Sequence, residues 1–478
     1  MENRKEDLYD FQIKGNNLED RRRRARARLS RLKEEEKKSE IIEDRKDFVC
    51  YNSKDSKMKL KCEQDSVSGA VSQRACVYCG ARVVLNPITD AFHLIHGPIG
   101  CAAYTWDLRG SLSSGSELFR NSFSTDLNET DIIFGGEKKL INAIDEIVKK
   151  FNTKVIFVYA TCIVGVIGDD IDAVCNMAEK KYSIRVIPVK SPGFSGNKST
   201  GYRAACDALI KLIGDKKVPK KAHGINYLGD FNLAGEVWVV QNYLKRIGVD
   251  IVSKLTGDGK YNEIIKAPEA SLNIVQCAGS MGYLAKKMEE MYGIPFIKTS
   301  FVGLEDTENS LIQIAHILGD EEMVKKAKAL IKEEEEKIKP ELEYYRGRLR
   351  GKKAAIYVGG GYKAISLIKQ FRDLGIETVM VGTQTGKAED YDIIEKITNP
   401  GTVILDDANP YELEKFMVEK GADILVGGVK ERPLAYKLGV AFCDHNHERK
   451  HILGGFQGAV NFAKEIDLTV NSPVWDYV

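Results

Sequence analysis

Residues 140–160 read LINAIDEIVKKFNTKVIFVYA, and this stretch decides the fold class. Leu140, Ile144, Ile147 and Phe151 recur at the spacing of one helix face, which predicts an amphipathic helix. Residues 154–160 follow it and are mostly β-branched or aromatic, which is typical of a strand buried on both faces. A helix that leads directly into such a strand is the repeating unit of a parallel α/β sheet.

The same alternation continues to the end of the chain. Short apolar runs predict further strands, and segments with helical periodicity separate them. These runs span residues 184–189, 224–228, 272–276, 294–298, 354–358, 378–381, 402–405, 423–426 and 440–443. We therefore expect an α/β protein with three doubly wound, Rossmann-like parallel-sheet domains, whose ligands bind beyond the carboxyl ends of the strands.

Changes in composition predict the domain limits. Residues 1–48 are dominated by charge, and we expect them to form a charged helical arm. A polar segment at residues 216–223 separates two α/β units, 49–222 and 223–345. A charged helix from Asp320 to Pro340 then precedes a third unit, residues 346–478.

The arm contains four consecutive arginines, Arg21 to Arg24. Such a run could neutralise nucleic-acid phosphates. However, no aromatic residues lie among the arginines, and an acidic block at residues 34–36 follows. The chain as a whole has 71 basic and 69 acidic residues, so it has no global field for nucleic acid. We favour a solvated arm, or one that clasps a protein partner, over nucleic-acid binding.

Overall composition indicates an ordinary globular protein. The 478 residues are 43% hydrophobic and 29% charged, which excludes disordered, collagenous and coiled-coil chains. The longest apolar stretch, residues 155–167, is too short to span a bilayer, and no signal-peptide pattern opens the chain. We expect a cytoplasmic protein without a membrane partner. Its ten cysteines should then be reduced, and serve as metal ligands, reactive thiols or core residues.

Several cysteines occur where strands are predicted to end. Cys162 follows the strand at 154–160, and Cys277 ends the strand at 272–276. Cys76 and Cys101 lie in a glycine-rich region with little regular pattern. Thiolates held at strand ends suit soft metals and iron–sulfur clusters. Cys79 forms a C-x-x-C pair with Cys76, a weak signal for zinc or redox chemistry because no second pair follows. Cys175 and Cys206 occupy apolar helix positions and are expected in the core.

Three motifs, taken together, are specific. They read CVYCGARVVLNPITDAFHLIHGPIGCAAYTWDLRG (76–110), YATCIVGVIGDDI (159–171) and LNIVQCAGSMGYLAKKMEEMYGIPF (272–296). Their order and spacing resemble the nitrogenase component 1 superfamily, from about residue 70 to the C-terminus. Within it, the chain looks more like the scaffold subunits that mature the iron–molybdenum cofactor than like the catalytic α subunit. The resemblance implies three α/β domains arranged around a central cluster site.

The resemblance implies two metal sites. Cys76, Cys101 and Cys162 would bind a [4Fe–4S] cluster at the interface with a homologous N subunit, which supplies the fourth thiolate. Cys79 could compete with Cys76, which we favour by its position in the motif. Cys277 would tether an iron–sulfur precursor of the cofactor. A histidine provides the second tether in the catalytic subunit, and Gly454 of GGFQG stands in its place here.

Other departures from the family pattern agree with a scaffold. Lys198, Tyr202 and Arg203 lie in a segment where catalytic subunits carry a glutamine and histidines. A glycine-rich loop from Gly359 to Lys363 replaces a loop that bears an arginine. Arg109 is retained eight residues after Cys101, and its guanidinium could bind cluster sulfides or an organic acid. The implied cofactor-binding set is Cys277, Arg109, Lys198 and Arg203.

The implied function is assembly rather than turnover. The chain would form a heterotetramer with the N subunit and receive its precursor from an upstream radical enzyme. Molybdenum and homocitrate would then be inserted with help from the nitrogenase iron protein. The interface cluster would relay electrons or brace the interface. The alternative is a reductase, either a nitrogenase α-like catalytic subunit or a relative that acts on a tetrapyrrole.

The histidines give weaker signals. His445, His447 and His451 lie close together in the sequence and could bind one metal ion, although polar loop histidines are more common. His93 is expected to pack in the core. His96 precedes Gly97 and is expected to hydrogen-bond the turn that aims Cys101.

Overall fold

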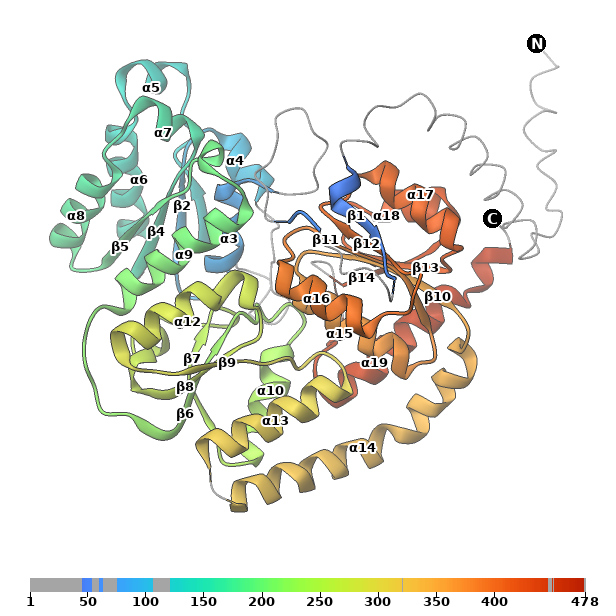
Figure 1. The fold of residues 1–478 in the computed structure, drawn as a ribbon. Coiled ribbons are helices and arrows are strands. Elements are labelled where there is room, and N and C mark those ends of the chain that lie inside the picture. Colours follow the sequence, from blue (N-terminus) through green and yellow to red (C-terminus); the bar gives the residue numbers. More distant parts are fainter. Residues whose placement is uncertain are drawn as a thin grey trace, which may run out of the picture.

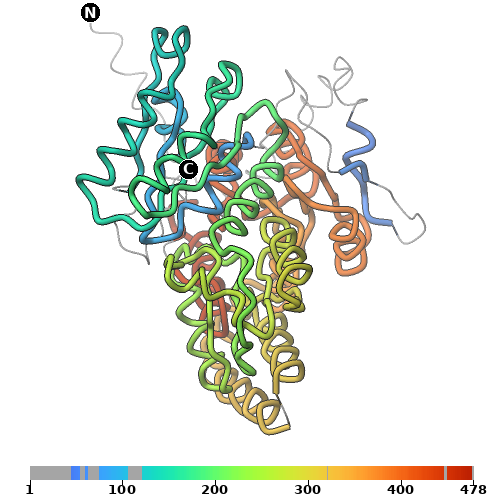
Figure 2. Tube along the Cα trace, turned by 90° about the vertical axis from the view of Figure 1, so that its left-hand side faces the viewer, coloured from blue at the N-terminus to red at the C-terminus, as the bar shows by residue number. Residues whose placement is uncertain are grey.

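The computed structural model describes residues 45–53, 60–62, 75–105, 121–319, 321–445, 449 and 451–476. Within these residues the strands form three sheets. All neighbouring strands are parallel, except that one edge strand of the third sheet is antiparallel to its neighbour. Figure 1 shows the first sheet above the second, with the third beside them. The view in Figure 2 separates the same three units, with the second below the other two. The predicted α/β fold with several parallel sheets is confirmed.

The first sheet has the strand order β3-β2-β4-β5, so the chain reverses its direction of winding between β2 and β4. Helices α6 and α8 cover one face, while α3 and α9 cover the other. The strands are β2 (Phe92–His96), β3 (Ser122–Ser124), β4 (Val155–Ala160) and β5 (Arg185–Lys190). The helices are α3 (Val77–Leu85), α4 (Ile99–Tyr104), α5 (Glu129–Phe134), α6 (Glu137–Lys150), α7 (Cys162–Ile167), α8 (Ile171–Tyr182), η3 (Gly193–Ser195) and α9 (Lys198–Ile213).

The second sheet repeats this topology in the order β7-β6-β8-β9. Its strands are β6 (Lys221–Leu228), β7 (Asp250–Leu255), β8 (Ala270–Val275) and β9 (Phe296–Lys298). Its helices are α10 (Glu236–Arg246), α11 (Tyr261–Ile264), η4 (Ala267–Glu269), α12 (Ala278–Tyr292) and α13 (Leu304–Leu318). Strand β7 was not predicted, because its sequence DIVSKL interrupts the apolar run with a serine and a lysine.

The third sheet has six strands in the order β1-β12-β11-β10-β13-β14. Strand β1 pairs antiparallel with β12, whereas the expected unit of residues 49–222 groups it with the first sheet. The strands are β1 (Val49–Tyr51), β10 (Lys353–Val358), β11 (Glu377–Thr383), β12 (Val403–Asp406), β13 (Ile424–Gly427) and β14 (Ala441–Asp444). The helices are η1 (Lys46–Phe48), α15 (Gly361–Asp373), α16 (Ala388–Ile397), α17 (Pro410–Lys420), α18 (Arg432–Lys437), α19 (Gly455–Val470) and η5 (Pro473–Asp476). Residues 1–44 of the predicted arm lie outside the described residues.

A long helix, α14 (Glu321–Leu349), connects the second unit to the third and runs along the lower edge of Figure 1. We expected it to end at Pro340, and this was wrong. Proline removes one backbone hydrogen bond, but Ile338, Leu342 and Tyr345 continue a buried stripe through that point. Packing of this stripe outweighs the local cost. None of the helices in the described ranges is long and apolar enough to cross a bilayer.

Two glycines allow α3 and α9 to touch backbone to backbone. A Cβ atom on Gly80 would overlap the carbonyl oxygen of Lys198, and one on Gly201 would overlap the carbonyl oxygen of Val77. Such close contact fixes α9 against α3, the helix that follows Cys76. The position of Cys76 relative to the first sheet therefore depends on this glycine pair.

We predict that Gly201→Ala lowers the free energy of unfolding by about 1–3 kcal/mol, because the added methyl group forces two buried backbones apart. The matched control is Gly282→Ala in α12, where nothing lies within 4 Å of the added Cβ. That change should stabilise the protein by about 0.5–1 kcal/mol through helix propensity. Urea unfolding midpoints check both, and equal effects of the two substitutions would contradict the close helix contact.

Candidate metal-cluster site

Parallel pairing of β2 with β4 brings two of the predicted ligands to one edge of the first sheet. His96 pairs with Ala160, so both strands end at the same level. Cys101 lies in α4, shortly after β2, and Cys162 is the first residue of α7, separated from the end of β4 by Thr161 alone. The two connections are joined, because Thr161 donates from its backbone nitrogen and its hydroxyl to the carbonyl oxygen of His96.

The turn before Cys101 is held by buried polar groups. The His96 ring bonds to Thr125 through Nδ1 (3.0 Å) and to Asp169 through Nε2 (2.9 Å). The Thr125 hydroxyl also accepts a hydrogen bond from the Gly97 nitrogen, so the His96 ring is linked to this turn through Thr125 and not by the direct bond that we expected. Gly97 has φ +159, which is extended backbone, and a side chain there would collide with Thr161. His93, the other histidine of β2, is packed against Phe157 in the core, as expected. Its ring also hydrogen-bonds the Tyr159 hydroxyl.

Cys76 approaches the same edge from α3, of which it is the N-cap. Gly193 lies between Cys76 and Cys162. A Cβ atom on Gly193 would be 2.9 Å from Cys162 Sγ and 3.7 Å from Cys76 Sγ. The Gly193 nitrogen also donates a hydrogen bond to Cys162 Sγ. The absence of a side chain at this glycine leaves room beside both thiols.

The third thiol, Cys101, is electrostatically coupled to the other two. Burial raises its pKa, and negative charge on Cys162 and Cys76 raises it further. Three thiolates at one edge would repel one another, and a metal cation bound by them would relieve that repulsion. The described residues hold no set of three His, Cys, Asp or Glu side chains that could surround a single metal ion. The thiolates of an iron–sulfur cluster bind different irons and are therefore spread further apart.

Cys79 lies on a different part of α3. It is 2% exposed and hydrogen-bonds the Tyr104 hydroxyl, whereas Cys76 is half-buried and faces Gly193. Competition between the two cysteines therefore favours Cys76 on accessibility. Cys175 and Cys206 are fully buried in separate apolar clusters of the first unit, as expected for core residues.

Cys277 is in the second unit, apart from this group. It is the half-buried N-cap of α12, one residue beyond the residue that follows β8, and Gly229 packs against it. The neighbouring Gln276 accepts a hydrogen bond from the Phe301 nitrogen. The Phe301 carbonyl in turn accepts one from the Gly455 nitrogen at 2.6 Å. This chain of bonds holds the loop that carries Gly454 next to the strand end that carries Cys277.

A buried charged group, which sequence reasoning missed, lies beside Gly454. Glu236 is 4% exposed and forms an ion pair with Arg449 at 3.2 Å. Burial, followed by the Glu236 carboxylate, raises the pKa of Asp230 to about 6. Asp230 is the second residue after strand β6, and its position after a strand was the signal that could have pointed to it.

The other predicted cofactor-binding residues, Lys198, Arg203 and Arg109, are not grouped around Cys277 in the part of the chain that the structure describes. Lys198 is the buried first residue of α9, and Arg203 is exposed on the same helix. Helix α9 packs against α12, the helix that begins after Cys277, with Cys206 Sγ donating to the Ser280 carbonyl. Arg109 lies outside the described residues, as does His447 of the suggested histidine site. His445 is fully buried, and its ring is edge-on to Phe462.

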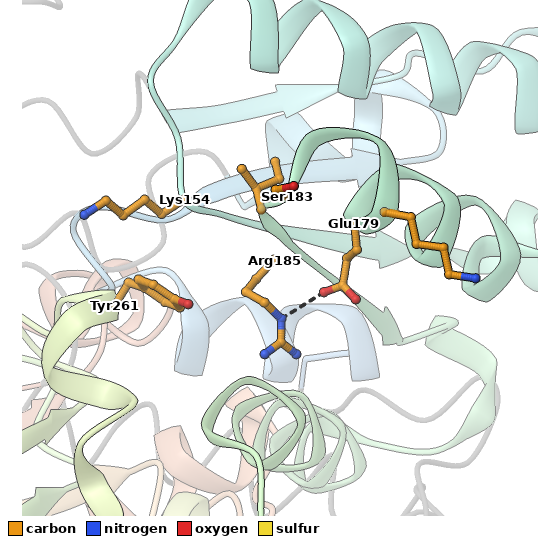
Figure 3. A pocket seen from close by; sticks show the side chains of 7 residues that line it. Lys154, Glu179, Ser183, Arg185 and Tyr261 are labelled. Carbon is orange, nitrogen blue, oxygen red and sulfur yellow. Dashed lines mark hydrogen bonds and ion pairs between the residues drawn. The ribbon is translucent and has the colours of Figure 1, made fainter. Parts of the chain in front are cut away.

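A surface cavity of about 500 Å³ lies at the opposite edge of the first sheet. Figure 3 shows Arg185 in this cavity, paired with Glu179, and Tyr261 approaching from the second unit. Lys154 and Arg185 stand at the amino ends of β4 and β5, whereas Cys162 follows the carboxyl end of β4. None of the described residues that line the cavity carries a thiol, so the cavity is separate from the candidate cluster site.

Comparison with known proteins agrees with this geometry. The nitrogenase component 1 type oxidoreductase family matches residues 76–471. The nitrogenase iron-molybdenum cofactor biosynthesis protein NifE of Clostridium pasteurianum is 72% identical, over 93% of this chain and 98% of that protein. The NifE of Methanosarcina barkeri is 52% identical, over 92% and 97%. The solved structure of nitrogenase Cp1 at pH 5 is 31% identical, with a TM-score of 0.83 over 91% of this chain and 96% of that chain.

The resemblance inferred from the three cysteine motifs is thereby confirmed, and so is the predicted branch, since the highly identical relatives bear the cofactor biosynthesis name. The chain belongs to the nitrogenase component 1 type oxidoreductase family.

Proposed function

We propose that this chain is a scaffold subunit for assembly of the nitrogenase iron–molybdenum cofactor, working in a heterotetramer with a homologous N subunit. It holds an iron–sulfur precursor on Cys277 while molybdenum and homocitrate are inserted. An upstream radical enzyme supplies the precursor, and the nitrogenase iron protein assists insertion. The relatives named for cofactor biosynthesis support assembly as the function.

The observation that carries the proposal is the glycine at position 454. It lies on the loop tied to Gln276, next to Cys277, where the resemblance puts a histidine in the catalytic subunit. Glycine has no ligand atom. Metal affinity falls as protein ligands are removed, so a guest held by Cys277 is retained less firmly. Weak retention suits a scaffold, which must release its product.

The three-thiol edge fits a resident iron–sulfur cluster. Cys76, Cys101 and Cys162 would hold it, and a [4Fe–4S] cluster would take its fourth thiolate from the partner. When bound, such a cluster supplies one-electron chemistry. The protein's own part is to hold the three sulfurs on rigid elements and to donate a hydrogen bond to Cys162 from Gly193.

The surface around these thiols supports pairing with another subunit. Large apolar side chains from four separate elements are exposed there. They are Ile99, Tyr104, Ile133, Phe134, Val166 and Phe194, each more than half exposed. Contiguous exposed apolar surface marks protein interfaces. A partner that covers this surface would also complete the cluster's ligands.

Lys198 and Arg203 are proposed to attract the anionic guest and its organic acid. Both lie on α9, which packs on the helix that follows Cys277. Arg109 is proposed for the same role by its place in the motif.

We predict that Cys277→Ala loses the precursor but keeps the interface cluster, because the two sites are on different sheets. Cys162→Ala should do the reverse and weaken subunit pairing. Iron content and electron paramagnetic resonance of the anaerobically purified complex measure both. Cys175→Ala is the matched control, since this buried core thiol should affect neither signal. Equal iron loss from the first two variants would argue against two distinct sites.

We predict that Gly454→His slows release of the precursor about tenfold or more, by adding a second ligand opposite Cys277. A Cβ at this position lies 3.2 Å from Glu236 Cγ, so that side chain must shift slightly. Gly454→Ala requires the same small shift of Glu236 but adds no ligand atom, so it should leave the rate of precursor release unchanged. Transfer of the metal guest to an acceptor protein is the measurement, and equal rates for the two variants would remove the role assigned to this glycine.

The scaffold and the reductase alternatives differ in turnover. We predict that the purified complex, supplied with ATP and the nitrogenase iron protein, reduces neither acetylene nor dinitrogen at rates of about 1 per second or above. Gas chromatography of the headspace measures this. Sustained turnover at enzymatic rates would identify a catalytic subunit instead.

A further inference from the structure

Arg82 carries a positive charge into the interior of the first unit. It lies on α3 and is 1% exposed, the largest side chain among those that are almost fully buried. Its Nη2 donates to the Ser122 hydroxyl, but Nε and Nη1 have no hydrogen-bond partner. Among the described residues, no carboxylate lies within ion-pair distance of this guanidinium.

The groups around Arg82 are polar but neutral. Its guanidinium carbon is 5.7 Å from the centroid of the Tyr159 ring. Its positive charge acts to lower the pKa of Tyr78 and of His93. Burial keeps both phenols protonated and holds the pKa of His93 well below its usual value. None of these groups supplies a negative charge. An isolated buried charge of this kind destabilises a folded protein.

Arg82 bonds Ser122, which pairs with His93, three residues before the end of strand β2. It follows Cys76 by six residues on one helix, about 9 Å along the axis. The ring beneath it belongs to Tyr159, three residues before Cys162 on the same strand end. Its neighbour Tyr78 bonds the Thr105 hydroxyl (2.6 Å), which bonds the carbonyl of Cys101 (3.3 Å). Each of these links joins the backbone of a cysteine to a group beside Arg82.

We propose that Arg82 is the buried countercharge of the iron–sulfur cluster on Cys76, Cys101 and Cys162. Thiolates on iron sulfide make a cluster anionic, and this cation balances that charge from the protein side. At about 10 Å and an effective dielectric constant of about 20, one charge changes the affinity for a unit anion roughly tenfold. The inference rests on the proposed interface cluster and adds its electrostatic partner.

The charge has opposite consequences with and without the cluster. In the cluster-free protein Arg82 is unpaired, so an apolar side chain of similar length should be more stable there. In the loaded protein the same replacement removes an attraction, and it also makes an added electron less favourable. Arg82→Met should therefore raise the melting temperature of the iron-free complex, lower the cluster's reduction potential and speed iron loss to a chelator about tenfold.

The experiment uses the full chain purified anaerobically with its partner subunit. Redox titration followed by electron paramagnetic resonance gives the potential, a ferrous chelator gives the rate of iron loss, and calorimetry gives the melting temperature after iron removal. Arg82→Lys keeps the charge and should keep the potential close to wild type. Val83→Ala, a neutral truncation of the adjacent buried residue, should lower the melting temperature without moving the potential.

An unchanged potential and an unchanged rate of iron loss in Arg82→Met, with wild type fully loaded, would overturn the inference. If Arg82→Met is not recovered as folded protein, Arg82→Gln decides, because it removes the charge but keeps a donor for Ser122. A wild-type complex with no iron on the three thiols would instead count against the proposed interface cluster.

Discussion

The register of β2 against β4 is the constraint on which the cluster site depends. Because the two strands run parallel and His96 pairs with Ala160, the connections that follow them leave the sheet at the same edge. Bonds from Thr161 to His96 then fix the start of α7 against the turn before α4. Backbone geometry alone therefore makes neighbours of Cys101 and Cys162, which are 61 positions apart in the chain. The glycine contact between α3 and α9 brings in Cys76 by a second route.

The two thiol sites differ in how firmly the protein surrounds a guest. At the first sheet, three thiols lie at one edge, and the missing side chain of Gly193 leaves space beside two of them, Cys76 and Cys162. At the second sheet, Cys277 follows a strand end, and the loop held against that strand end presents glycine at position 454. The first arrangement suits a resident group that joins two subunits. The second suits a guest that arrives, changes and departs.

The sequence predicted the elements whose pattern is continuous and missed those whose pattern is broken. Strand β4 was predicted because its residues form a continuous apolar run. Strand β2 was not, because two histidines interrupt its sequence, FHLIH, although the whole strand is buried. Helix α14 passes through Pro340 because tertiary packing overrides a local signal. The cysteines could be assigned because their spacing resembles a known family. Arg82 and the Glu236–Arg449 pair could not, since the burial of a charged side chain, with or without a partner, depends on three-dimensional packing and leaves no periodic trace in the sequence.

The most direct test of the account is an iron map of the anaerobically purified complex, obtained by anomalous diffraction at the iron absorption edge. The account predicts one iron peak enclosed by the sulfurs of Cys76, Cys101 and Cys162, at the boundary with the partner, and a second beside Cys277. Iron bound through Cys79 in place of Cys76, or a single peak shared by Cys277 and the first-sheet thiols, would contradict it.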